Sequence, residues 1–173
     1  MRQIFSAIAA LSLIGTTVNA FAHITLADRT APAGTHYKVV LRVPHGCNGS
    51  ATTALHVKIP EGVIGIKPMP KTGWKLETKD GEYVKGYEYH GQTLTHGVSE
   101  IIWSAGYLPD AWFDEFSFMV MLPDAPAGTK IYFPVIQVCE KGVTRWIEIP
   151  AEGKDAHDYD APAPGLTLSA ASH

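Results

Sequence analysis

The sequence has no long segment with helical periodicity, and its 12 prolines disfavour long helices. Beyond residue 22 it has no apolar run of transmembrane length, so we expect the processed product to lack a membrane anchor.

The sequence also lacks an excess of basic charge. Arg2 is the only charged residue among the first 22, and the remainder carries 13 basic against 17 acidic side chains, a net charge of −4. This balance disfavours a nucleic-acid-binding protein, which would need a basic face.

Recognisable catalytic motifs are missing as well. There is no G-x-S-x-G, and the eight histidines show no H-x-H, H-x-x-x-H or H-E-x-x-H spacing. We therefore assign no catalytic residue and expect that the protein is not an enzyme.

Cysteine is scarce, because the chain has only Cys47 and Cys139 and no C-x-x-C motif. In an exported protein such a pair predicts a disulfide. It would close a loop of roughly 90 residues and stabilise the fold by about 4–5 kcal/mol on the chain-entropy model. The alternative is a thiolate metal site, for which two distant cysteines give weaker grounds.

The first 22 residues have the features of a secretory signal peptide. Arg2 is followed by the apolar run 4–14, and Ala20-Phe21-Ala22 fits a cleavage site. A membrane anchor and cleavage after Ala20 are the alternatives. Cleavage after Ala22 would leave 151 residues beginning at His23, the size of one domain, in the periplasm or secreted.

Short segments of alternating apolar residues, separated by Gly, Pro, Asn and Asp, follow one another through the mature chain. This spacing predicts an all-β protein, a single-domain antiparallel β-sandwich over residues 23–168 with a short tail at 169–173. The expected strands cover residues 36–43, 54–60, 86–91, 99–106, 113–122, 130–139 and 144–150, with a weaker candidate at 166–168.

An N-terminal His23 would have two nitrogen donors on one residue. Its free α-amine and its imidazole Nδ1 can chelate one metal ion together near neutral pH. Two nitrogens suit Cu(II) in particular. Any residue before His23 would turn the amine into an amide, so only the cleaved chain forms this chelate. The alternative is that histidine follows the cleavage site without any role.

Other donors are harder to assign from the sequence alone. Glu115 is either a hard third ligand to copper or a solvated residue on the outer face of a sheet. The same two roles are open to Glu88, Glu100 and Glu148. Met119 and Met121 share one strand face and could hold Cu(I), although a core role is commoner for methionine among apolar neighbours.

Several long segments together carry a resemblance to a known family. They are AHITLADRTAPAGTHYKVVLRVPHGCNGSATTALHVKIPEGV, KPMPKTGW, EIIWSAGYLPDAWFDEFSFMVMLPDAPAGTKIYFPVIQVCEKGVTRWIEIP and HDYDAPAPGLTL. Over about residues 23–168 the chain resembles the YcnI-like copper-binding domain of bacteria, formerly a domain of unknown function. The resemblance implies an exported immunoglobulin-like β-sandwich, often encoded beside copper-handling genes.

The resemblance also implies a metal site. One Cu(II) per chain would be held by a monohistidine brace, the amine and imidazole of His23, with a carboxylate that matches Glu115 best. Glu100 or Glu148 could replace Glu115. Trp146 matches the tryptophan that lies close to the metal, and Cys47 and Cys139 match the paired cysteines. Many members carry a C-terminal membrane helix, which this sequence does not show, so a soluble periplasmic form is expected.

The function expected from this reading is that of a copper chaperone, store or homeostasis factor, whose partner is another copper-handling protein. One alternative is a copper-dependent oxidative enzyme of the polysaccharide-monooxygenase type. Such an enzyme needs a second histidine near the metal, and folding could bring His45, His90 or His96 close. The other alternative is a metal-free sandwich that binds another protein.

Overall fold

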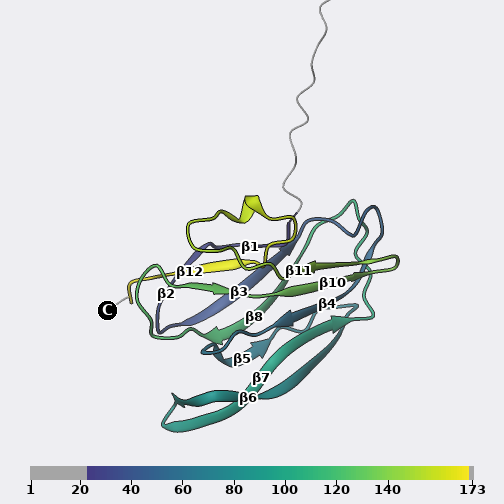
Figure 1. Cartoon of the computed structure of the whole chain (residues 1–173). Coiled ribbons are helices and arrows are strands. Elements are labelled where there is room, and N and C mark those ends of the chain that lie inside the picture. Colours follow the sequence, from purple (N-terminus) through teal and green to yellow (C-terminus); the bar gives the residue numbers. More distant parts are fainter. Residues whose placement is uncertain (1–22, 172–173) are drawn as a thin grey trace, which may run out of the picture.

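The computed structural model describes residues 23–171, so the expected signal peptide lies outside the described residues. The described part is built almost entirely of strands (Figure 1). In chain order these are β1 (Thr25–Leu26), β2 (Thr30–Pro32), β3 (His36–Val43), β4 (Thr52–Lys58), β5 (Ile64–Pro68), β6 (Lys75–Tyr89), β7 (Gln92–Ser104), β8 (Asp114–Met121), β9 (Lys130–Tyr132), β10 (Val135–Cys139), β11 (Val143–Trp146) and β12 (Gly165–Ser169), with the 3-10 turn η1 (Ala156–Asp158) before the last strand.

The strands form two main sheets that enclose one core. One sheet has the order β1-β3-β8-β5 and the other β11-β10-β4-β7-β6, while β2, β12 and β9 form a small third sheet. Aromatic side chains join the two main sheets, since the ring centre of Trp103 on β7 lies 5.5 Å from that of Phe116 on β8. Both rings are buried, and such contacts add about 0.5–1.5 kcal/mol to the effect of burial itself. The predicted all-β sandwich is confirmed.

Alternation decides which side chains enter this core. Along β8, Phe116, Phe118 and Val120 are buried, while Glu115 and Met119 point to the outer face of the sheet. A strand presents successive side chains to opposite faces, so this outcome follows from the sequence pattern. The expectation of a core role for methionine is wrong for Met119, which is 40% exposed.

Two strand predictions are corrected by the structure. The expected short strand at 86–91 is part of the hairpin of β6 and β7, whose strands have 15 and 13 residues. The polar edge strand β6 does not show the apolar alternation of a half-buried strand, although it pairs along β7 with two register shifts. The expected strand 130–139 is divided into β9 and β10 around Phe133 and Pro134.

The predicted disulfide is confirmed, because Cys47 and Cys139 are bonded with their Cα atoms 6.0 Å apart. It fastens the loop after β3 to the end of β10. Residues 23–171 contain no helix with the length and apolar character needed to cross a membrane.

Candidate metal centre

His23 lies where the edges of the two main sheets come together. It precedes β1, the edge strand of one sheet, and its ring centre is 5.5 Å from that of Trp146 on β11, the edge strand of the other. Ile24 is 2% exposed and belongs to the core, so the backbone next to His23 is anchored. The structure thus brings together two residues that are 123 positions apart and were both singled out from the sequence.

A buried amide holds Trp146 in place. The side chain of Gln137 on β10 is fully buried, and its Oε1 accepts a hydrogen bond of 2.9 Å from the Trp146 indole nitrogen. Its Nε2 donates to the backbone oxygen of His45 at 2.7 Å and to the Thr52 hydroxyl at 2.7 Å. Gln137 therefore ties the tryptophan beside His23 to the loop that carries His45, two residues before Cys47 of the disulfide.

Two further histidines lie within electrostatic range of His23. Partial burial lowers the pKa of His23, and the charges of His157 and His45 lower it further, while Asp160 acts in the opposite direction. The net effect favours the neutral imidazole, the form that binds metals. Of the histidines considered for a second ligand, His45 is the one that acts on the pKa of His23. His157 was not predicted, because the sequence places it only in an acidic loop.

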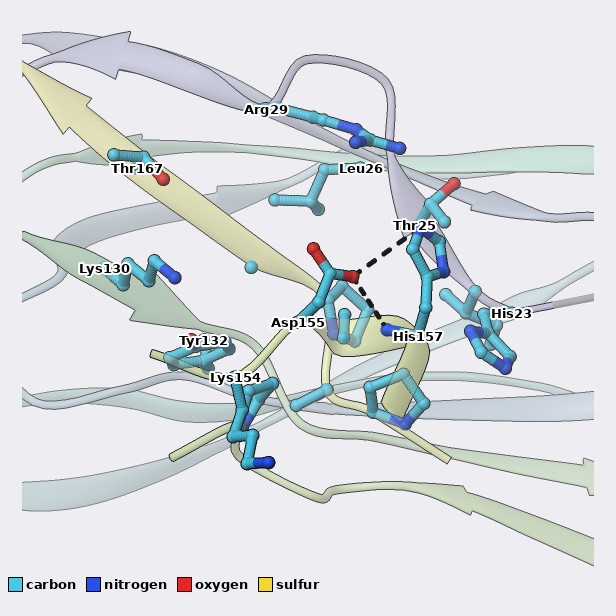
Figure 2. Close-up of a pocket in the computed structure, with 17 residues that line it drawn as sticks. His23, Thr25, Leu26, Arg29, Lys130, Tyr132, Lys154, Asp155, His157 and Thr167 are labelled. Atoms are coloured by element: carbon cyan, nitrogen blue, oxygen red, sulfur yellow. Dashed lines mark hydrogen bonds and ion pairs between the residues drawn. The ribbon is translucent and has the colours of Figure 1, made fainter. Parts of the chain in front are cut away.

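The segment between β11 and β12 presents His157. In the turn η1, Asp155 accepts a hydrogen bond from the backbone nitrogen of His157 at 2.9 Å, and its carboxylate lies 3.7 Å from the imidazole Nε2. Asp158 completes a capping box by accepting from the backbone nitrogen of Asp155. Figure 2 shows His23 and His157 on the same side of a cavity of about 220 Å³, which both residues line.

Glu115, the preferred carboxylate, lies on the outer face of β8 and is paired with Arg42. Its Oε1 is 3.0 Å from the arginine Nε, and both side chains are about half exposed, at 45% and 51%. Arg42 lies opposite Thr25 in β1, so Glu115 is two strands away from the strand that follows His23.

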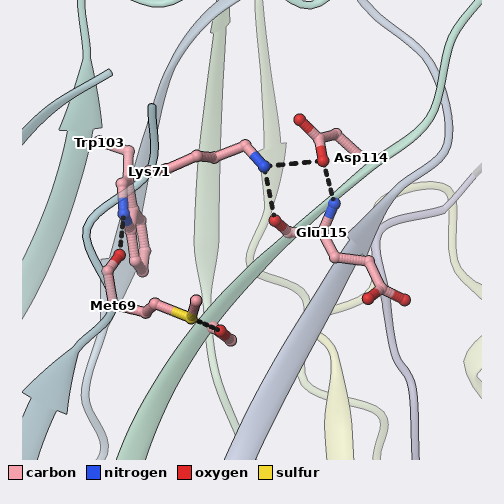
Figure 3. Close-up of polar contacts among 6 residues, drawn as sticks. Met69, Lys71, Trp103, Asp114 and Glu115 are labelled. Carbon is pink, nitrogen blue, oxygen red and sulfur yellow. Dashed lines mark hydrogen bonds and ion pairs between the residues drawn. The ribbon is translucent and has the colours of Figure 1, made fainter. Parts of the chain in front are cut away.

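The backbone around Glu115 is fixed by its neighbours. Lys71 donates to the Asp114 carboxylate at 2.7 Å and to the Glu115 carbonyl at 3.1 Å. The same Asp114 oxygen accepts from the Glu115 backbone nitrogen at 2.8 Å. Figure 3 shows the Glu115 carboxylate pointing away from Lys71.

The two alternative carboxylates have other partners. Glu100 accepts from Lys79 at 2.7 Å and contacts the imidazole of His56 at 2.9 Å. Glu148 lies two residues after Trp146, and its Oε2 accepts from the backbone nitrogen of Ala161 at 2.6 Å, which closes the base of the loop that carries His157.

Two other histidines considered from the sequence lie in the β6–β7 hairpin. His90 occupies its turn and packs against His36, and His96 on β7 lies opposite Glu82 on β6.

The donors near His23 suit a site that relies on the terminal residue itself. Among residues 23–171, no three His, Cys, Asp or Glu side chains are grouped so that they could hold one metal ion. A chelate by His23 would not need such a group, because an α-amine freed by cleavage would supply one donor and the imidazole a second. Two nitrogen donors of this kind suit Cu(II).

Comparisons with known proteins agree with this fold. A family model described as a domain of unknown function, DUF1775, matches residues 23–168. A search of curated proteins gives no match. Among solved structures, the chain is similar to an uncharacterized protein from Nocardia farcinica whose crystal structure reveals an immunoglobulin-like fold. The identity is 26%, with 86% of this chain and 99% of that chain covered, and the TM-score is 0.64. The immunoglobulin-like architecture is thereby confirmed.

Proposed function

The chain belongs to the DUF1775 family, and from this premise we propose that it is an exported protein that binds one Cu(II) through the amine and imidazole of His23. The observation that carries the proposal is the position of His23, whose ring lies beside that of Trp146 and which lines a cavity. Cleavage after Ala22 would place the new amine at this position. The resemblance to the YcnI-like copper-binding domains supports the same assignment.

The surroundings suit transfer of copper better than permanent storage in a closed cage. His23 is only partly buried and supplies two donors, so the remaining coordination positions are open to solvent or to a partner. Glu115 is the carboxylate that we propose as a further ligand, and to reach the metal it must leave Arg42. Because exposed ion pairs contribute only about 0–1 kcal/mol, this exchange costs little. We propose a chaperone or homeostasis role without turnover, with another copper-handling protein as partner.

The decisive experiment compares two chains that both begin at His23, as verified by mass spectrometry. In the first the α-amine of His23 is free, and in the second it is acetylated. We expect the first to bind one Cu(II), with nitrogen couplings from amine and imidazole in its electron paramagnetic resonance spectrum. The second should bind at least about tenfold more weakly, since loss of a ligand should cost no less than loss of a residue that supports one. Equal affinities would contradict the proposal.

One observation favours a second candidate, the oxidative copper enzyme. His45 and His157 both influence the charge state of His23, so two further imidazoles lie within electrostatic range of the terminal histidine. An enzyme of that type would show a third nitrogen in the spectrum of bound Cu(II), and this nitrogen would disappear in His45→Ala or His157→Ala. It would also oxidise a polysaccharide when supplied with a reductant and oxygen. If the spectrum shows only two nitrogen ligands, and neither His45→Ala nor His157→Ala changes them, the oxidative-enzyme candidate is excluded and the non-enzymatic role stands.

A further inference from the structure

We infer that the chain carries a second metal site, for a soft monovalent ion such as Cu(I), formed by the imidazoles of His36 and His90 and the thioether of Met121. This site does not depend on the N-terminal amine or on the proposed function. Its three residues come from three separate elements, β3, the β6–β7 turn and β8.

Two of the three ligands are neighbours across the β3–β8 pair. His36 lies directly opposite Met121 in the register of the two antiparallel strands. Side chains at such positions project from the same face with Cβ atoms about 4.5–5.5 Å apart. The alternation along β8 places Met121 on the outer face, with Glu115 and Met119, and therefore outside the apolar core.

The turn of the β6–β7 hairpin contains His90, the third proposed ligand, and lies beside this face. His90 and Gly91 form its two-residue turn with φ values of 50° and 76°, the left-handed pair of a type I′ turn. The end of the hairpin is fastened to the sheet by Tyr89, whose hydroxyl oxygen would lie 2.7 Å from a Cβ at Gly65 of β5. A larger residue at position 65 would therefore displace Tyr89 and the turn that holds His90.

The two imidazoles are spaced as required for binding one ion. The ring centres of His36 and His90 are 5.8 Å apart, and the ring planes differ by 15°. Two imidazoles on opposite sides of one ion, with metal–nitrogen bonds of about 2.0–2.1 Å, have ring centres roughly 6 Å apart. The two rings are stacked, so both side chains must rotate before one nitrogen of each ring points at a shared ion.

The donor types select a soft ion. Thioether sulfur prefers Cu(I), and imidazole accepts copper in either oxidation state, whereas Ca²⁺ and Mg²⁺ require oxygen ligands. Met121 also lines a cavity of about 580 Å³ together with Lys85, Glu88 and Asp124. Two carboxylates and one lysine line this cavity, a balance that favours a cation near Met121.

The second site is well separated from the first. Arg42 lies opposite Thr25 near the N-terminal site, and His36 is six residues away from Arg42 along β3. A strand rises about 3.4 Å per residue, so the two sites are about 20 Å apart on the same sheet. One ion cannot use ligands from both, and the two sites can be measured independently.

The test uses the chain that begins at His23 with its α-amine acetylated, which removes the N-terminal chelate. Cu(I) is titrated without oxygen against a chromogenic Cu(I) chelator, and X-ray absorption identifies the ligands. We expect one bound Cu(I) with one sulfur and two nitrogen ligands. Met121→Leu, a volume-conserving change, should weaken binding at least about tenfold and remove the sulfur signal. Met69→Leu is the matched control, because Met69 is 56% exposed and its sulfur instead accepts from Ser117.

A second variant, in another element, tests the site independently in case Met121→Leu does not fold. His90→Asn keeps a residue that tolerates positive φ, so the turn should survive while the imidazole is lost. It should also weaken Cu(I) binding, with thermal melting used to verify folding. The inference is overturned if Met121→Leu and Met69→Leu bind Cu(I) equally well, or if bound Cu(I) shows no sulfur ligand. Failure of the Cu(II) proposal would leave this result unaffected, because the chain tested has no free amine on His23.

Discussion

The substitution Gln137→Leu tests whether a buried amide organises the candidate metal centre. The Gln137 side chain bonds the Trp146 indole, the His45 carbonyl and the Thr52 hydroxyl, and it is fully buried. Leucine fills a similar volume but can neither donate nor accept. The change therefore removes the polar contacts with little effect on packing.

The expected destabilisation follows from the groups left without a partner. The Trp146 N–H loses its buried hydrogen bond to Gln137, and an unsatisfied buried group costs about 1–3 kcal/mol. The Thr52 hydroxyl can rotate and the bond to the His45 carbonyl is only part-buried, so we count the tryptophan alone. The free energy of unfolding should fall by about 1–3 kcal/mol. Since domains are typically stable by about 5–15 kcal/mol, the disulfide-bonded variant should remain folded at room temperature.

Urea denaturation followed by tryptophan fluorescence measures this loss. Gln92→Leu is the control, because Gln92 is exposed at the start of β7 and its replacement should change stability by no more than about 0.5 kcal/mol. Cu(II) affinity should also decrease in the Gln137 variant, since Trp146 is no longer held beside His23. A loss of stability below about 1 kcal/mol, or an equal loss in both variants, would refute the reasoning.

Two further predictions concern the carboxylates. Glu115→Gln should leave stability within about 0.5 kcal/mol, because its ion pair with Arg42 is half exposed, yet it should weaken Cu(II) binding. Glu77→Gln, which removes an exposed acid paired with Lys75, is the control, and equal Cu(II) affinities in calorimetry would exclude Glu115 as a ligand. Burial tends to raise the pKa of Glu100, but hydrogen bonds from Lys79 and His56 outweigh it and hold the pKa below its usual value. The stability that this provides is present above the ordinary glutamate pKa and is lost as pH falls through the folded value. The difference in unfolding free energy between the wild type and Glu100→Gln should therefore shrink from neutral pH towards pH 3, and a constant difference would contradict this assignment.

The fold was largely predictable because its core strands carry a local signal. Apolar residues at every second position predicted the bounds of β3 and β8 to within one residue, and these residues are buried in the structure. The hairpin of β6 and β7 was not predictable in full, because β6 is a polar edge strand without apolar alternation. Its stability comes from pairing with β7, which no local pattern reports.

The candidate site was only partly predictable. His23 was named from the expected cleavage site and Trp146 through the family resemblance, and the structure places their rings together. His157 was missed because its proximity to His23 depends on how the segment before β12 folds back, and Gln137 because a buried amide has no distinctive spacing. The Arg42 partner of Glu115 follows only from the register of β3 and β8.

The sequence by itself determined most of the core strands and the cysteine pair, and it predicts the residue at which a cleaved chain would begin. Period-two alternation, export and peptide cleavage are local properties of the chain. Only the tertiary structure decided which histidines act on the charge of His23, that Glu115 is paired with Arg42, and that His36 lies opposite Met121 and beside His90. These contacts join residues far apart in sequence, and they are set by strand register and loop packing, which depend on the whole fold.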